Sequence, residues 1–454
     1  MKRDAINFDT ENVSALFRKL LIPTLFGAIS VSCVTAIDGI FVGHGVGAEG
    51  VAAVNFFVPV YQIIAGLGLM IGAGCSVVSS IHLSRKNLKA ARLNITQAFV
   101  VASVFTLLFC ALMLCFPYQT AKILGVSETL TPLVVDYLMW LTPSYVFELW
   151  MLIGLFIIRL DGSPRFAMWC NIVPAALNVL FDWLFIFPLD MGVKGAAIAT
   201  SLCHLSGGCL VMGYLLWKAE TLRFVRLKLS KKSLMLTARN IGYQIKVGSS
   251  SLFGELTLAV LIYVGNITFL EYLGDEGVGA FGVACYYTPF FFMIGNSIAQ
   301  SAQPIISYNY GISRWEQVRK VRSLLLYTSF VLGLIVSLMF VGIPDILVAL
   351  FVDINGRAGQ IAVEGFPLYA SGIIFFILNV AIVGYYQSVE QIRKATIFVF
   401  LRGLVLLVPS FIILPKMFGV SGIWLAMAAA EFATLVLIWL TSIVARIRSR
   451  RQTV

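Results

Sequence analysis

Several acidic residues of this sequence lie inside long apolar segments, where a charged carboxylate is costly. Asp182 stands between Phe181 and Trp183 in the segment NVLFDWLFIFPLD. Burying a carboxylate among such neighbours costs several kcal/mol unless something uses it. No lysine or clearly buried arginine accompanies these acids, and a neutral acid is easier to bury than a carboxylate. Such protonatable groups suit the exchange of protons or other cations. The acids in apolar segments are Asp38, Asp136, Glu148, Asp182, Glu255 and Glu431.

Two of these acids, together with one asparagine, are predicted to form a polar pocket. Counting the helical rise from Lys19 and from Arg165 places Asp38 and Asp182 at similar depths, about 28 Å and about 25 Å along their helices. Asn178 lies one turn before Asp182 on the same helical face, and its amide can bond either form of the acid. In the alternative interpretation, both acids lie near the interface with their tips in water.

The remaining acids allow weaker interpretations. Glu255 lies above Lys246 and near the start of its segment. It is either a second cation or substrate site or one partner of a helix–helix hydrogen bond. Glu431 lies near the middle of the last segment, and Arg402 on the neighbouring segment is its expected structural partner. The sequence offers no partner for Glu148.

The composition requires that these residues be positioned by membrane-spanning helices. The chain of 454 residues is 59% hydrophobic and 12% charged, whereas soluble domains carry about a quarter charged residues. Twelve apolar segments are each long enough to cross a hydrocarbon core of about 30 Å as a helix. We therefore predict an all-α polytopic membrane protein. The predicted spans are 20–42, 51–81, 93–117, 130–158, 166–188, 194–217, 243–270, 278–308, 323–343, 362–386, 395–415 and 420–444.

The basic residues indicate orientation. Nearly all of the 33 Lys and Arg fall in alternate loops and at the two ends, including Lys2, Arg3 and Arg446–Arg451. The positive-inside rule then places both termini in the cytoplasm, with the protein in the cytoplasmic membrane. The net charge of +11 is thus a topology signal, and we expect a lipid-bilayer environment and no nucleic-acid partner.

The sequence also repeats itself at half its length, without a gap. We therefore predict two six-helix bundles, 1–217 and 241–454, joined by a basic linker over 218–240. Because six spans are an even number, the bundles are related by a pseudo-two-fold axis along the membrane normal. This plan is typical of transporters that rock between two states, and it disfavours a channel. The matched pairs include Lys19 with Lys246, Pro117 with Pro344, Pro188 with Pro415, Gly192 with Gly419 and Gly195 with Gly422.

Motifs for other activities are missing. The sequence has no Walker motif and no H-E-x-x-H, so we predict neither ATP-driven transport nor an enzyme, and no cofactor. An alternative function, that of a membrane prenyltransferase, would need clustered D-D-x-x-D acids to bind Mg²⁺ and diphosphate, and the sequence has no such cluster. The stretch GLGLMIGAG contains Gly68-x-x-x-Gly72, and this spacing indicates close helix packing.

Several segments resemble the multidrug and toxic compound extrusion (MATE) family, over nearly the whole chain. They are VTAIDGIFVGHGVGAEGVAAV, NVLFDWLFIFPLDMGVKGAAIATSL, QPIISYNYG, YYQSVEQIRKATIFVFLRGL, FGVSGIWLA and AEF. The resemblance implies a monomeric secondary transporter that exports amphipathic, often cationic, organic compounds in exchange for H⁺ or Na⁺. A lipid-linked oligosaccharide flippase of the same broad superfamily is the first alternative, although it would need a cationic cavity.

The resemblance also implies a cation-coupling site. The residue types that the proton-coupled branch uses on spans one, five and six match Asp38, Asn178, Asp182 and Thr200. The sodium-coupled branch uses a glutamate on span seven, which Glu255 resembles, with an aspartate on span ten. Span ten of this chain, FPLYASGIIFFILNVAIVGYY, contains no acid. The first-half set is therefore the stronger prediction, with H⁺ favoured over Na⁺.

Overall fold

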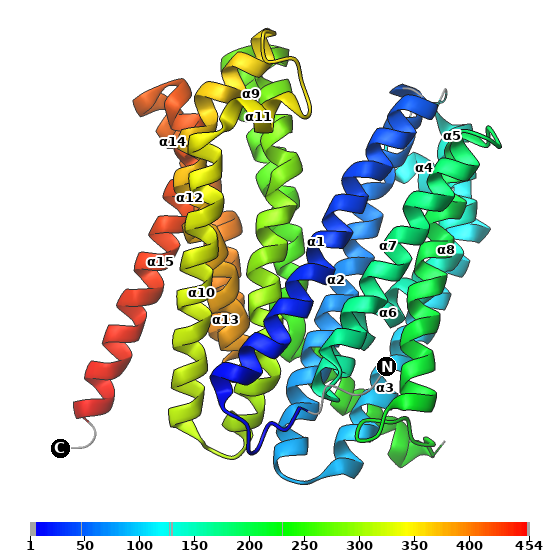
Figure 1. Ribbon diagram of the computed structural model, residues 1–454, viewed down its shortest axis with the longest axis vertical. Helices are drawn as coiled ribbons and strands as arrows, with labels where there is room; N and C mark the ends of the chain where they lie inside the picture. Colours follow the sequence, from blue (N-terminus) through cyan, green and yellow to red (C-terminus); the bar gives the residue numbers. More distant parts are fainter. Residues whose placement is uncertain (1–5, 47, 127, 129, 229, 452–454) are drawn as a thin grey trace. The chain divides into compact units, whose positions relative to one another are not determined.

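The computed structural model describes residues 6–46, 48–126, 128, 130–228 and 230–451, and within these ranges it leaves the side chains of 36, 48, 49, 51, 52, 55 and 444–451 undescribed. The terminal basic residues Lys2, Arg3 and Arg446–Arg451 therefore lie outside the described side chains. The described residues form helices joined by short turns, with no strand among them (Figure 1).

The helices of the first half are α1 (Val13–Gly45), α2 (Ala48–Ser84), α3 (Leu88–Cys115), α4 (Pro117–Ile123), α5 (Thr131–Leu141), η1 (Thr142–Ser144), α6 (Tyr145–Leu160), α7 (Pro164–Ile186), α8 (Gly192–Gly213) and η2 (Tyr214–Lys218). Those that follow are α9 (Lys231–Gly311), α10 (Trp315–Gly342), α11 (Pro344–Ala349), α12 (Arg357–Ser388), α13 (Ile392–Phe400), η3 (Leu401–Val405), α14 (Leu407–Phe418) and α15 (Val420–Arg451).

The number of membrane spans agrees with the sequence prediction. Eleven helical segments of the described chain are long and apolar enough to cross a membrane, and one of them is the 81-residue α9. Helix α9 contains Gly274, whose φ of 66° and ψ of −159° are not helical. A backbone of this kind is accessible mainly to glycine. The kink divides α9 into two spans, so the chain has the twelve spans of the predicted all-α membrane fold.

The internal repeat is visible in the backbone as well as in the sequence. Lys86 and Ser313 both have a φ of 58°, and Gly192 and Gly419 have φ values of 56° and 59°. Each pair is separated by the same number of residues as the matched prolines. The breaks before α4 and α11 also correspond, because Pro is the first residue of each helix. The two halves of the chain therefore turn at equivalent positions.

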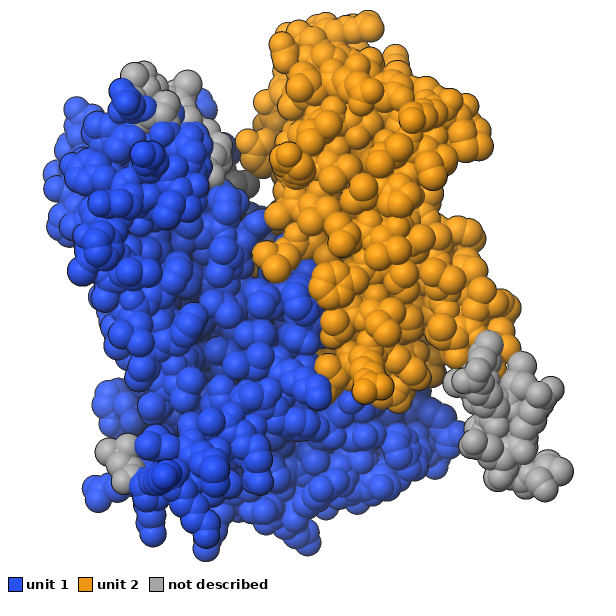
Figure 2. Space-filling view, turned by 180° about the vertical axis from the view of Figure 1, so that it is seen from behind, with its two compact units in different colours: residues 1–255, 300–321, 388–390 blue, residues 256–299, 322–387, 391–454 orange. Residues whose placement is uncertain are grey.

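Packing divides the chain into two compact units. Unit 1 comprises residues 1–255, 300–321 and 388–390, and unit 2 comprises 256–299, 322–387 and 391–454 (Figure 2). Unit 1 thus contains α1 to α8, the beginning and the end of α9, and the beginning of α10. All of the acids considered above except Glu431 lie in unit 1.

Glycines allow close helix contacts in unit 1, as the Gly68-x-x-x-Gly72 spacing predicts. A Cβ at Gly72 of α2 would lie 2.7 Å from the ring of Phe156 in α6, and a Cβ at Gly74 would overlap the carbonyl oxygen of Gln244 in α9. A carbonyl within a helix cannot move aside as a flexible side chain can. The position of α2 against α9 therefore depends on the missing side chain at Gly74.

This contact gives a stability prediction. Gly74→Val is expected to lower the free energy of unfolding by about 1–3 kcal/mol, the usual cost of overpacking. The measurement is thermal unfolding of the purified protein in detergent. Gly242→Val is the matched control, because a Cβ at Gly242 meets no atom within 4 Å. Equal melting temperatures for the two variants would contradict the proposed contact.

Candidate functional site

Two packed helices of unit 1 position the aspartates that the sequence singles out. Helix α1 runs alongside α7 (Figure 1), and a Cβ at Gly27 of α1 would lie 2.8 Å from the Asn171 amide of α7. Asp38 lies in the last third of α1. Asp182 lies one turn before the end of α7 at Ile186. The carboxyl end of a helix disfavours negative charge, so its position as well as its burial favours a neutral Asp182.

The two carboxyl groups lie within hydrogen-bonding reach of each other. Asp182 is fully buried. No described donor reaches either oxygen of Asp182 or the Oδ1 atom of Asp38. Two carboxylates contain no hydrogen to share, so a close pair of this kind requires at least one proton. The geometry is therefore that of a carboxyl pair able to share a proton.

The other two members of the predicted set, Asn178 and Thr200, do not bond the aspartates. Asn178 is buried, and its Nδ2 atom has no hydrogen-bond partner among the described residues. The expected hydrogen bond from Asn178 to Asp182 is therefore absent. The Thr200 hydroxyl on α8 instead donates to the carbonyl of Ala196 at 3.0 Å. This bond to the preceding turn is the usual way for a helical threonine to satisfy its hydroxyl.

The side chains of the predicted set offer mainly oxygen atoms as possible ligands. Asp38, Asp182, Asn178 and Thr200 supply carboxyl, amide and hydroxyl oxygens, which are the ligands that hard cations prefer. Among the described residues, no group of three or more His, Cys, Asp and Glu is arranged to hold a metal ion. A proton needs only the two carboxyl groups, whereas Na⁺ would also need the amide and hydroxyl oxygens turned toward it.

Glu148, which has no partner in the sequence interpretation, has one in the structure. Its Oε2 atom lies 3.6 Å from Nε2 of His204 on α8, and both side chains are buried. Sequence reasoning missed His204, although two signals pointed to it. It is an ionisable residue in an apolar span, and it lies one turn after Thr200 on the same face of α8.

Glu255 lies on the part of α9 that belongs to unit 1. Its Cβ is 3.6 Å from the position that a Cβ at Gly66 of α2 would occupy. The carboxyl group makes no hydrogen bond or ion pair with any described residue, so the predicted helix–helix hydrogen bond is not present. Glu255 lies close enough to Tyr61 of α2 for an electrostatic interaction with its hydroxyl group, and so does Glu148.

Glu431 in unit 2 forms a buried ion pair with Arg402. The Arg402 Nη2 and Nε atoms donate to Glu431 Oε1 at 2.7 and 3.0 Å. Asn379 Nδ2 donates to Glu431 Oε2 at 2.7 Å, and the guanidinium lies 4.3 Å from the centre of the Phe376 ring. Arg402 stands in the π-helical turn η3. Every charge of this cluster has a partner, as expected of a structural element.

Arg159 is an exception to the expectation that the basic residues lie in loops and at the ends of the chain. It is buried within α6, where Nη1 donates to Oε1 of Gln300 at 2.6 Å. No carboxylate among the described residues pairs with it, and Nε has no partner. The partner Gln300 is far away in the chain, so this burial could not be expected from the sequence.

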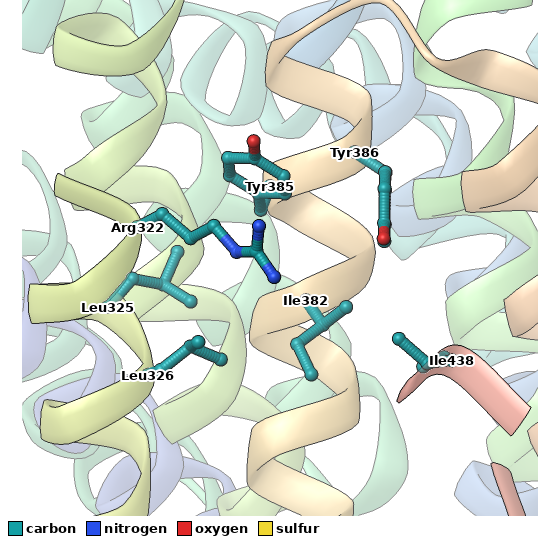
Figure 3. A pocket seen from close by; sticks show the side chains of 7 residues that line it. All are labelled: Arg322, Leu325, Leu326, Ile382, Tyr385, Tyr386 and Ile438. Carbon is teal, nitrogen blue, oxygen red and sulfur yellow. The ribbon is translucent and has the colours of Figure 1, made fainter. Parts of the chain in front are cut away.

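A small pocket in unit 2 does not extend the candidate cation site. Arg322 points toward the Tyr385 ring, with 5.2 Å between the guanidinium and the ring centre (Figure 3). The pocket contains no carboxyl group. Its lining consists of Arg322, Leu325, Leu326, Ile382, Tyr385, Tyr386 and Ile438.

Comparisons with known proteins agree with this architecture. The MatE family model matches residues 23–184 and 252–412. The multidrug export protein MepA of Staphylococcus aureus is 22% identical over 427 residues, which cover 92% of this chain and 91% of that protein. MepA of Staphylococcus haemolyticus is 22% identical over 424 residues, with the same coverage.

Two solved structures share the fold. One is the outward-facing conformation of a multidrug resistance MATE family transporter of the MOP superfamily, with a TM-score of 0.88, 20% identity and 97% of each chain covered. The other is a MOP superfamily transporter from Pyrococcus furiosus, described as having a binding pocket of reverse polarity that suggests a different function. Its TM-score is 0.87, with 20% identity and 96% of each chain covered.

The ion pair in unit 2 gives a prediction that separates structural from functional acids. Arg402→Met leaves Glu431 buried without a cation, and breaking a buried pair in this way costs about 3–5 kcal/mol. The double variant Arg402→Met/Glu431→Leu is expected to recover part of this loss. Asp182→Asn creates no buried charge and should unfold close to the wild-type temperature. Thermal unfolding in detergent measures all three, and a stable Arg402→Met variant would contradict the structural role.

Proposed function

Because the chain belongs to the MatE family, we propose that it is a secondary active multidrug exporter. It moves amphipathic or cationic organic compounds out of the cell by alternating access, in exchange for H⁺ or Na⁺. The curated relatives that support this are multidrug export proteins. Family membership makes the chain a transporter and not an enzyme. It acts in the lipid bilayer as a monomer, and it needs no cofactor besides the coupling ion.

The observation that carries the proposal is the pairing of Asp38, which is half-buried, with the fully buried Asp182. A carboxyl pair with no donor among the described residues changes its net charge when it binds or releases a proton, and in an apolar bundle this change has a large energetic effect. A cationic compound and a proton can then use the same negative charge alternately. This competition is the simplest basis for antiport.

The cycle follows from that competition. With one carboxyl protonated and the other ionised, the pair carries one negative charge and attracts an organic cation from the cytoplasmic side. A second proton, taken up from outside, then neutralises the pair, which removes the attraction, and the compound leaves outward. Exchange of one proton for one monovalent cation moves no net charge, so the proton concentration gradient drives it and supplies about 1.4 kcal/mol for each pH unit. Asn178 and Thr200 contribute by turning toward the pair in other states of the cycle.

We favour H⁺ over Na⁺ as the coupling ion, since the carboxyl pair alone suffices for a proton. Glu255 is assigned a secondary role, as a cation or substrate contact, because span ten offers it no acidic partner. The flippase alternative would need a cationic cavity. Of the described arginines that are buried, Arg159 is bonded to Gln300 and Arg402 to Glu431, and neither observation favours that alternative.

We also propose that the protein lies in the cytoplasmic membrane with both termini in the cytoplasm. The lobes would be residues 1–217 and 241–454, with 218–240 as a cytoplasmic linker. This orientation rests on the basic residues of alternate loops. Lys231 and Lys232 at the start of α9 belong to the linker and have exposed side chains.

The central test of the proposed function uses Asp182→Asn, which mimics a permanently protonated acid. Dye efflux is measured in inverted vesicles, energised in turn by a proton gradient and by a sodium gradient. We expect gradient-driven efflux by the wild-type protein and a complete loss in Asp182→Asn at equal expression. Glu255→Gln is the matched control and should retain partial efflux.

The opposite pattern would contradict the assignment of Asp182 as the coupling acid. If Glu255→Gln abolishes efflux while Asp182→Asn retains it, the coupling acid is Glu255. If neither gradient drives efflux of any organic cation by the wild-type protein, the exporter function itself is wrong. A response to sodium alone would replace H⁺ by Na⁺ at the same residues.

The orientation is tested by cysteine labelling. In a background without the exposed Cys33, Cys115 and Cys209, Lys232→Cys should react with an impermeant reagent only after the cells are permeabilised. Lys122→Cys, whose side chain is also exposed, lies in a loop of the opposite kind and should react in intact cells. Labelling of Lys232→Cys in intact cells would reverse the topology.

A further inference from the structure

A second pair of buried ionisable groups lies in unit 1, apart from the two aspartates. Glu148 on α6 is 2% exposed and His204 on α8 is 5% exposed. Their Oε2 and Nε2 atoms are 3.6 Å apart. The Oε2 atom has no hydrogen-bond partner among the described residues. An unpaired carboxylate oxygen beside an imidazole nitrogen inside an apolar bundle requires an explanation.

The hydrogen bonds of Ser144 determine which nitrogen of His204 carries hydrogen. The Ser144 hydroxyl donates to the carbonyl of Leu141 at 2.7 Å and also contacts Nδ1 of His204 at 2.9 Å. A serine has a single hydroxyl hydrogen, and here it is used for Leu141. Nδ1 of His204 must therefore donate to Ser144. In a neutral imidazole, Nε2 then has a lone pair, which faces Glu148.

Two acceptors thus face each other, the Glu148 carboxylate and the bare Nε2 of His204. One proton placed between them serves both, as a glutamic acid that donates to Nε2 or as an imidazolium that donates to the carboxylate. Either form is neutral overall. Without this proton the pair carries one negative charge that no described donor at Oε2 compensates, which is costly in an apolar environment.

No basic side chain described near the pair could compensate the negative charge of Glu148 in place of this proton. The Tyr61 ring stacks on His204 with its centre 6.5 Å from the imidazole centre, and the Tyr61 hydroxyl is within hydrogen-bonding reach of the Glu148 carboxyl group. Among the described residues, none of the titratable neighbours is a lysine or arginine. From the helices packed around the pair they are Tyr61 of α2, Cys110 of α3, Tyr145 of α6, Cys203 of α8 and Glu255 of α9.

The repeat provides an internal comparison. His204 follows Gly195 at the same distance as Glu431 follows Gly422, so the two residues occupy equivalent positions on α8 and α15. In unit 2 this position carries an ion pair with Arg402, whose guanidinium does not lose its proton in proteins. In unit 1 the same position carries an imidazole, which can gain and lose a proton. The position holds a fixed charge in one half and an exchangeable proton in the other.

We propose that Glu148 and His204 form a second proton-binding site, which takes one proton between Oε2 and Nε2. The proposal rests on the proposed antiport and extends it, because the site binds and releases a proton in the same cycle as the aspartate pair. The loaded site is neutral and the released site has one negative charge, with the proton exchanged with water. Tyr61 is a positioning residue that covers the pair.

The pairing is tested without transport, by NMR of ¹⁵N-labelled histidine. The chain has three histidines, so His44→Gln/His82→Gln leaves His204 as the only signal. We expect Nδ1 to carry hydrogen on both sides of neutral pH, and Nε2 to shift as the shared proton is lost. This measurement uses protein in which Glu148 and His204 are unchanged. The opposite tautomer, with hydrogen on Nε2 and a bare Nδ1, would overturn the assignment.

Two variants complete the test. Glu148→Gln should abolish the pH-dependent shift of Nε2 that the shared proton causes, whereas Glu255→Gln should leave it unchanged. An identical response of His204 in Glu148→Gln and in the parent protein would overturn the pairing. These outcomes do not depend on whether any drug is exported.

Participation in the cycle is tested by proton release when tetraphenylphosphonium is added to the purified protein. We expect Asp182→Asn to retain part of the release and Asp182→Asn/Glu148→Gln to lose it. If the NMR shows the shared proton but Glu148→Gln releases as many protons as the parent and transports at the same rate, the site is structural. If the parent binds no organic cation, the proposed function fails while the NMR result stands.

Discussion

A carboxyl group enclosed by apolar helices must carry a proton, face a cation or receive donors, and this constraint organises the polar interior of the protein. The structure uses each of these three arrangements at a different acid. Asp38 and Asp182 face each other without a donor at Asp182, Glu431 receives a guanidinium and an amide, and Glu148 faces an imidazole. Only the Arg402 cluster is closed to proton exchange, since all of its charges are compensated within unit 2.

The helices that hold these groups are fixed by apolar length and by small residues. Spans and their number were predictable from sequence, because a membrane requires long apolar helices whose backbone bonds are satisfied internally. The repeat was predictable because prolines and glycines mark turns, and the positive φ values at Lys86, Ser313, Gly192 and Gly419 show those turns recurring. The close packing at Gly72 was predictable from the Gly68-x-x-x-Gly72 spacing, whereas the contact at Gly74 was not predicted.

The candidate site was predictable only in part. Helical rise was sufficient to place Asp38 and Asp182 at one depth, because depth is a property of a single helix. Which hydroxyl or amide bonds which acid depends on side-chain rotamers and on neighbouring helices, so the bond expected from Asn178 was not found. The partners of Glu148 and Arg159 come from α8 and α9, and no spacing rule connects positions so far apart in the chain.

The exchange of an arginine-bound glutamate for a histidine at one repeat position makes the two halves chemically unequal. All three histidines of the chain lie in its first half, and the buried acid described in unit 2 is held by a guanidinium. The ion pair in unit 2 keeps its charges, whereas the Glu148–His204 pair, proposed as a second proton site in unit 1, can gain or lose one proton. On this proposal a change in acidity acts on the two halves unequally, because the group that responds lies in unit 1 while its counterpart in unit 2 stays charged.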